Sequence, residues 1–206
     1  MFIKAMHWIN VVILFIELNI LWLLGFIAGF FFAGLVPSTR AVLKLLNKQD
    51  LFTGYYSYSE IFQKYWQEYI RSIKIFQWRV IVFPILFSLF YVELVFIQQS
   101  SIMRAYFQWP ILIMMSYLLL VLLNLILATE MSGDSWLKKI AFSLVSPIVL
   151  PGRSLMCVVM ILSFAVLSLA YHWFFFVASP LFFYVASKCL ISGYQKKGLL
   201  LSLIHI

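Results

Sequence analysis

The sequence predicts an all-α integral membrane protein, a five-helix transmembrane bundle with cytoplasmic amphipathic surface helices. Hydrophobic residues make up 65% of its 206 residues and charged residues only 11%, whereas soluble domains are about half apolar and about a quarter charged. The mean hydropathy is +1.02, and the apolar residues fall into runs long enough to cross a bilayer. We therefore expect one transmembrane domain over residues 1–200.

Five apolar runs supply the predicted spans, because a helix needs about 20 apolar residues to cross a membrane. The last two runs are separated only by Tyr171, His172 and Trp173, which predicts a tight helical hairpin. Aromatic residues in such a turn are typical of the membrane interface. The five predicted spans are residues 8–35, 80–97, 108–129, 154–170 and 174–192.

The distribution of cations predicts the orientation of these spans. Thirteen of the 15 Lys and Arg residues lie in segments 36–79 and 130–153 and at the C-terminal end, and only Lys4 and Arg104 lie on the other side. Because cytoplasmic segments carry an excess of Lys and Arg, we expect the N-terminus outside and the C-terminus in the cytoplasm. The net charge of +8 follows from this topology, so we expect the lipid bilayer, and not nucleic acid, as the partner.

The cytoplasmic segments contain helix signals of their own. Pro37 and Ser38 mark a helix start, and the basic residues that follow lie opposite apolar ones, as on a surface helix. A later helix begins after Asp134, which can cap it, and ends at Pro147 and Pro151. We expect surface helices that brace the bundle or, as the alternative, a docking site for a cytoplasmic partner.

A helix between these two has the clearest amphipathic pattern. Ser57 and Glu60 have capping-box spacing, and an apolar series at helical spacing follows them. The opposite face is polar and basic, so the sequence predicts an aromatic helix on the inner leaflet that runs into the second span. The apolar series is Phe62, Tyr65, Trp66, Tyr69, Ile73 and Phe76.

Polar residues inside the predicted spans are candidate functional residues, because a charge at mid-membrane costs about 2.5–3.5 kcal/mol. They are Glu17, Asn19, Glu93 and Asn124. Glu17 and Glu93 fall in the outer half without a nearby cation. They either share a carboxylate site for a proton, cation or polar ligand, or each is protonated, hydrogen-bonded to a neighbour or at the interface. For Asn19 and Asn124 we expect hydrogen bonds between helices.

A stripe of small residues accompanies Glu17 in the first span. Gly25, Gly29 and Ala33 are spaced by four, which predicts close approach of another helix. Because each step of four residues turns the side chain by about 40°, Glu17 lies beside this stripe and not on its centre.

Motifs of enzymes are missing from the sequence. There is no Gly-rich phosphate loop, no HExxH, no GxSxG and no Cys or His cluster with metal spacing. We therefore expect no enzyme, no catalytic or metal-binding residues and no cofactor. Cys157 and Cys189 lie inside predicted spans, where we expect them to pack as small apolar residues.

Two motifs carry a family resemblance. The first is N-I-L-W-L-L at residues 19–24, followed by G-L-V-P-S-T-R-A at residues 34–41, and the second is I-F-Q-K-Y-W-Q-E-Y-I-R-S at residues 61–72. They resemble the N-L-L-W-L-L, G-x-x-P-A-T-x-A and F-x-x-F-W-K-x-Y-x-x-x-F signatures of the YesL-like family of bacterial membrane proteins, a domain of unknown function. Ser38 stands where the family has alanine, and Glu17 is not part of its pattern.

The resemblance implies a bacterial plasma-membrane protein encoded near carbohydrate uptake and breakdown systems, and it implies no reaction. It also adds Trp22, Gly34, Pro37, Thr39 and Trp66 to the candidate residues. Separately, residues 201–206 equal one reading frame of a transposase adapter used in sequencing libraries. We expect those six residues not to be native.

Three functional hypotheses remain open at this stage. The leading one is a non-enzymatic accessory or regulatory component of a sugar-uptake system, whose helices around Trp66 and Trp136 contact a transporter or regulator. The alternative is a small transporter or channel, formed as a homo-oligomer, that uses Glu17 and Glu93. The third is a structural membrane scaffold.

Overall fold

The computed structural model describes residues 2–31, 33–47, 57–130 and 135–196, and all regular structure in these ranges is helical. Two short 3-10 helices, η1 and η2, join longer α-helices. The elements are α1 Phe2–Ala28, α2 Leu35–Leu46, α4 Tyr58–Phe76, η1 Gln77–Ile81, α5 Val82–Ile97, α6 Ser101–Ala128, α7 Trp136–Val149, α8 Pro151–Ala170, η2 His172–Phe174 and α9 Phe175–Lys196.

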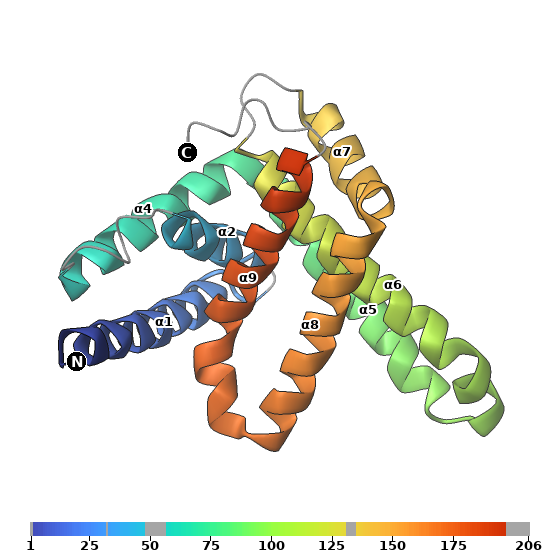
Figure 1. Ribbon diagram of the computed structural model, residues 1–206. Coiled ribbons are helices and arrows are strands. Elements are labelled where there is room, and N and C mark those ends of the chain that lie inside the picture. The colour runs from blue at the N-terminus through green and yellow to red at the C-terminus, as the bar shows by residue number, and fades with distance from the viewer. Residues whose placement is uncertain (1, 32, 48–56, 131–134, 197–206) are drawn as a thin grey trace.

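The helices converge on one region and diverge from it as arms (Figure 1). We call the convergence region the junction; it contains α2, the C-terminal end of α6 and the helix segments packed on them. The arms are α1 with α4, the α5–α6 hairpin and the α8–α9 hairpin. This splayed arrangement differs from the compact bundle that the sequence predicts.

Two helices in the described ranges are long and apolar enough to cross a membrane, Trp8–Ala28 and Ser101–Ala128. Two bent pairs also qualify if each counts as one span, which raises the number to four. The bends are 66° between Tyr58–Arg79 and Val82–Ile97 and 87° between Trp136–Val149 and Pro151–Phe164. The chain is thus an all-α protein with two to four candidate spans, and the five predicted spans are matched only in part.

The first predicted span ends earlier than its apolar composition indicates. α1 ends at Ala28, and a turn through Gly29 and Gly34 leads into α2. A Cβ atom on Gly34 would lie only 2.5 Å from the carbonyl oxygen of Phe26, so only glycine fits there. The small-residue stripe therefore does not continue along one helix, although Gly25 does allow the close approach that its spacing predicts.

α2 is buried, which corrects the prediction of a surface helix. It begins at Leu35, so Pro37 lies in its first turn, and ten of its twelve residues are buried. α1, α4 and α9 all pack against it. The alternation of apolar and basic residues in α2 does not mark a face toward water, because the basic face meets acidic partners inside the protein.

α4 runs beside α1 in the same direction (Figure 1). Its N-terminal residue Tyr58 lies near Glu17, and the hydroxyl of Tyr69 donates a hydrogen bond of 2.9 Å to the carbonyl of Gly25. Ser57 occupies the N-cap position, but its side chain makes no capping hydrogen bond. The predicted capping box with Glu60 is therefore not formed.

The buried face of α4 is rotated from the predicted one. Phe62 and Ile73 belong to the predicted apolar face but are exposed, whereas Ser72 is buried. The contact with α2 determines which face of α4 is buried. α2 packs on the side of α4 that carries both aromatic and small polar residues. The buried residues are Ile61, Tyr65, Tyr69, Ser72 and Phe76.

α7 and α8 meet at a sharp corner. Pro147 lies within α7 instead of ending it, and α8 begins at Pro151. Leu137 is 78% exposed, as expected for a helix that faces lipid. Ser135 takes the N-cap position, and the predicted capping residue Asp134 lies outside the described residues.

Candidate functional site

α2 places Arg40 at the centre of the junction, where it is only 2% exposed. Its Nε donates to the Thr129 hydroxyl at 3.1 Å and its Nη1 donates to the Ser72 hydroxyl at 3.0 Å. Its Nη2 donates to a carboxylate oxygen of Glu130. One guanidinium thus joins α2 to α4 and to the end of α6, and the planar fork of arginine suits such multiple bonding.

Two carboxylates and two further cations complete this site, which we call the Arg40 cluster. Lys44, one turn after Arg40, donates to the other oxygen of Glu130. One carboxylate oxygen of Glu68 lies 3.8 Å from Arg40 Nη1, and the other lies 3.9 Å from Arg71 Nη1. Because buried charges are costly unless paired, these contacts make the three helices depend on one another.

The sequence did not predict this cluster. Arg40 is one of the basic residues expected on the exposed face of a surface helix, and neither Glu68 nor Glu130 was a candidate residue. Arg40 and Glu130 are 90 residues apart, so no local pattern predicts their pairing. The sequence feature that could have pointed to Glu68 and Glu130 is the scarcity of acidic residues, because only 7 of 206 residues are Asp or Glu.

The motif residues of the family resemblance lie together at the corner between α1 and α2. The Trp22 indole donates to the Thr39 hydroxyl at 3.1 Å, and that hydroxyl donates to the Leu35 carbonyl at 2.7 Å. Gly34 forms the close turn, and Pro37 is buried in the first turn of α2. These residues fix how α2 folds back along α1 and so where Arg40 points.

Trp66 lies half-buried on the flank of α4. Its ring centroid is 5.1 Å from that of Tyr69 and 5.7 Å from that of Tyr65, both edge-on. Edge-to-face aromatic pairs of this kind are favourable, so Trp66 ties the flank of α4 to its buried face. The opposite face of α4 is exposed and polar, with Glu60, Gln63, Gln67, Arg71 and Lys74.

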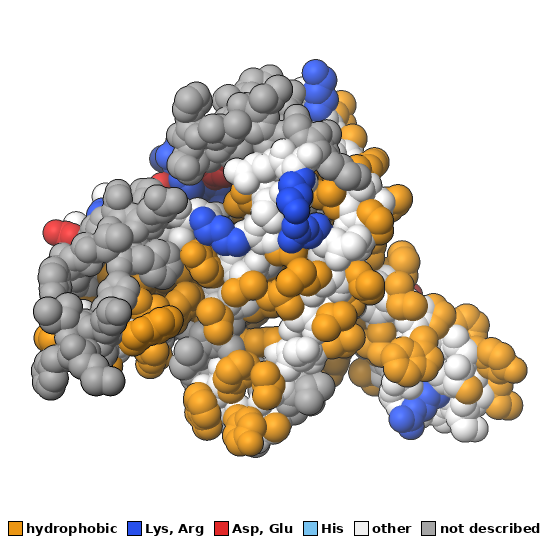
Figure 2. Space-filling model, viewed as in Figure 1, with side chains coloured by type: hydrophobic (Ala, Val, Ile, Leu, Met, Phe, Trp, Pro, Cys, Tyr) orange, Lys and Arg blue, Asp and Glu red, His pale blue; other side chains and the backbone are white. Residues whose placement is uncertain are grey.

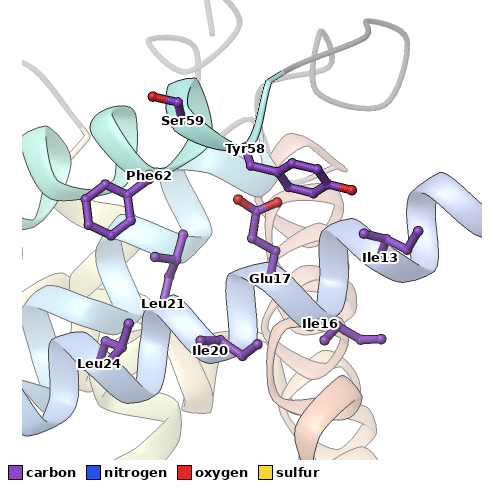
Figure 3. Close-up of a pocket in the computed structure, with 9 residues that line it drawn as sticks. All are labelled: Ile13, Ile16, Glu17, Ile20, Leu21, Leu24, Tyr58, Ser59 and Phe62. Atoms are coloured by element: carbon purple, nitrogen blue, oxygen red, sulfur yellow. The ribbon is translucent and has the colours of Figure 1, made fainter.

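Glu17 lines an open groove of about 550 Å³ between α1 and the start of α4. Figure 3 shows its carboxylate pointing toward the end of α4 that carries Tyr58 and Ser59. Apart from Tyr58 and Ser59 the other described lining residues are apolar, and among the described residues Glu17 alone brings a charge to the groove. The apolar lining residues are Ile13, Ile16, Ile20, Leu21, Leu24 and Phe62.

Glu93 does not join Glu17. It is exposed on α5, in the arm that points away from the N-terminal part of α1 (Figure 1). A single chain therefore brings no shared carboxylate site together from these two residues.

The position of Glu17 also bears on topology. Glu17 is expected in the outer half of the membrane and α4 at the cytoplasmic face, yet Glu17 and Tyr58 line the same groove. These expectations are compatible only if α1 is strongly tilted. A helix of 27 residues is about 40 Å long, which exceeds the hydrocarbon thickness of about 30 Å and permits tilt.

Asn19 and Asn124, the two asparagines of the predicted spans, are both fully buried. Asn124 donates to the Leu120 carbonyl of its own helix at 2.9 Å, and it accepts a hydrogen bond from the hydroxyl of Tyr194 in α9. This is the helix-to-helix bond that the sequence predicts for Asn124. Tyr194 was not predicted as its partner, because nothing local relates residues 70 positions apart.

Comparison of the chain with protein-family models, curated proteins and solved structures finds no match. The resemblance to the YesL-like family therefore depends on the two motifs alone.

Proposed function

We propose that this protein is a non-enzymatic accessory component of a carbohydrate-uptake system in the bacterial plasma membrane. The observation that supports it is the arrangement of α4, whose inner face is fixed by the Arg40 cluster while its outer face is exposed. The carbohydrate assignment comes from the family resemblance. An accessory protein needs a contact surface, and α4 supplies one.

The composition of α4 suits contact with another protein. Its polar side chains flank three exposed apolar ones, Phe62, Ile70 and Ile73. Protein interfaces commonly combine an apolar centre with a polar rim. Because the cluster holds α4 in place before any partner binds, less conformational freedom is lost on binding.

The proposal includes five spans, with the N-terminus outside and the C-terminus in the cytoplasm. Figure 2 shows Lys and Arg side chains over the junction and a basic group on the tip of the α5–α6 arm, where Arg104 lies in the first turn of α6. Positive charge favours the cytoplasmic side, so the junction and α4 belong there. α1 then crosses the membrane strongly tilted from the bilayer normal.

Affinity purification of the tagged protein from its native membrane, in mild detergent, tests the accessory role. We expect a sugar importer or a sugar-sensing regulator to co-purify with the wild type. Gln63→Glu with Gln67→Glu, which places two negative charges on the outer face of α4, should remove it, and Trp66→Ala should weaken it. The matched control is Gln98→Glu with Gln99→Glu at the α5–α6 turn, where both residues are exposed.

Two outcomes of this purification argue against the accessory role. Recovery of the protein alone contradicts it. Recovery of an importer that the α4 variant and the control retain equally places the contact elsewhere.

One observation favours the second candidate, a small homo-oligomeric transporter or channel. Among the described lining residues, Glu17 is the one charged group in an open and mostly apolar groove. Because Glu93 lies on another arm, a shared site would need residues from two chains. Flux in proteoliposomes decides this candidate: it requires solute or proton flux that Glu17→Gln and Glu93→Gln each reduce, and flux unchanged by both removes it.

A further inference from the structure

Three sulfur atoms gather where α8 and α9 pack together near the junction. Cys189 Sγ lies 3.7 Å from Met156 Sδ, and Cys157, the residue after Met156 on α8, is buried and its thiol interacts electrostatically with that of Cys189. Both cysteines are buried and free. Met156 is 50% exposed, so the group is not sealed from its surroundings.

A single cation lies against these sulfurs. Arg153 Nη1 is 3.8 Å from Cys189 Sγ. The stem of Arg153 passes over Gly193 of α9, where an added Cβ would lie 3.1 Å from Arg153 Cγ. Gly193 therefore leaves room for the guanidinium to reach the thiols from α8.

We propose that Cys157, Cys189 and Met156 form a binding site for monovalent copper, Cu(I). Thiolate and thioether ligands favour soft ions such as Cu(I). A structural zinc ion usually takes four ligands, most often thiolate or imidazole, and the described residues hold no group of three His, Cys, Asp or Glu that could supply them.

Charge balance favours the same ion. Both thiols release their protons when the metal binds, so two negative thiolates surround one positive copper ion. The neighbouring Arg153 adds one positive charge and makes the whole group neutral. A divalent ion would leave a net positive charge beside two buried cysteines, where an unbalanced charge is costly.

The sulfur spacing also fits a metal ion. Sulfur ligands about 2.3 Å from a metal in a trigonal arrangement are about 4.0 Å apart. The distance of 3.7 Å between Cys189 Sγ and Met156 Sδ is close to this value. Small shifts of the Cys189 and Met156 side chains are therefore enough for both sulfurs to bind one ion.

Cu(I) competition with a coloured chelator, bathocuproine disulfonate, tests the proposal on the full chain in detergent. The protein is first reduced and kept free of oxygen, and its thiols are counted so that a disulfide is excluded. We expect one Cu(I) per chain to move from the chelator to the protein, with elemental analysis after gel filtration giving the same ratio. Zn(II) offered in the same way should not be retained.

Four substitutions identify the ligands. Cys157→Ser and Cys189→Ser should each abolish the transfer, and Met156→Leu should weaken it. Arg153→Gln should lower the affinity about tenfold or more, as removal of groups beside metal ligands does. The control is Met114→Leu on α6, since Met114 is 51% exposed and resembles Met156 in that respect.

The competition gives a clear result in either direction. Copper that stays with the chelator overturns the proposal, as does copper uptake that both serine variants retain. If a serine variant fails to fold, the exposed Met156→Leu variant decides, and affinity equal to that of Met114→Leu refutes the site. The proposal is independent of the accessory role, because it is measured on the isolated protein.

Discussion

The two ends of α6 differ in what surrounds them. Residues 120–128 are all buried in the junction, whereas most side chains of the first two turns, in the α5–α6 arm, are exposed. Figure 2 shows the same contrast, with apolar side chains spread over the arms. The junction is held by specific partners, while the arms expose apolar surface of the kind that contacts lipid or another protein.

Because of this difference, substitutions at the junction should lower the free energy of unfolding more than substitutions on the arms. At the junction the buried Arg40, Ser72 and Asn124 each have named hydrogen-bond partners, so removing a partner leaves a desolvated group. On the arms, one apolar side chain facing lipid can replace another at little cost. Free energies of unfolding measured in detergent micelles should therefore separate matched pairs of substitutions in the two regions.

Arg40→Ala should have the largest effect. It leaves the partly buried Glu68 and Glu130 with fewer cations, and breaking a buried ion pair typically costs about 3–5 kcal/mol. Arg104→Ala is the control on the arm, since its only described side-chain hydrogen bond is an exposed one to Gln108, and it should change stability by less than about 0.5 kcal/mol. Equal effects would mean that the junction has no special role.

Gly25→Ala should be the next most destabilising. The added Cβ would lie 2.1 Å from the Tyr65 hydroxyl, and Tyr65 is fully buried and has no space to retreat. Overpacking of this kind costs about 1–3 kcal/mol. Gly152→Ala, with no atom within 4 Å of the new Cβ, should be neutral or stabilising, and a loss equal to that of Gly25→Ala would contradict the packing.

Tyr194→Phe tests the hydrogen bond between α6 and α9. It leaves a buried oxygen of Asn124 without its donor, which costs about 1–3 kcal/mol. Tyr117→Phe removes a hydroxyl that donates to the Leu144 carbonyl at an exposed place, so its effect should be smaller. The order of the two thermal unfolding midpoints checks this, and a reversed order argues against the bond.

Gln77→Gly should have the smallest effect on the free energy of unfolding, and it should raise that free energy where the other substitutions lower it. Gln77 ends α4 with a φ of 53°, a conformation that side chains strain to adopt and glycine does not. Relief of this strain should stabilise the protein by about 1 kcal/mol. Gln67→Gly in the middle of α4 should instead destabilise it by about 1 kcal/mol, and the same sign for both would remove the strain argument.

The sequence predicted the arms better than the junction. Hydropathy is a local property, so the predicted runs at 80–97, 154–170 and 174–192 agree closely with α5, α8 and α9. The turn between α1 and α2 was missed because its residues are as apolar as a span. Only the contact between Gly34 and the backbone of Phe26 distinguishes it.

The Arg40 cluster and the rotated face of α4 were beyond local patterns for a common reason. Both depend on which other helix packs against α2 or α4. The helical spacing of residues within one segment does not reveal that neighbour. Phe62 and Tyr65 are both aromatic, yet only Tyr65 is buried, because α2 lies on its side of α4. The motif residues were singled out by resemblance, and the structure gives several of them a role in placing Arg40.

We propose that the junction presents α4 to a transport component. Site-specific photo-crosslinking in the native membrane can test this contact. The crosslinking residue replaces Gln67 on the outer face of α4 or, as the control, Gln99 at the far turn of the α5–α6 arm; both positions are exposed. The account predicts an adduct with a component of a sugar-uptake system from position 67 and none from position 99. Adducts that are the same at both positions, or that join position 67 only to lipid or to a second copy of this chain, would contradict it.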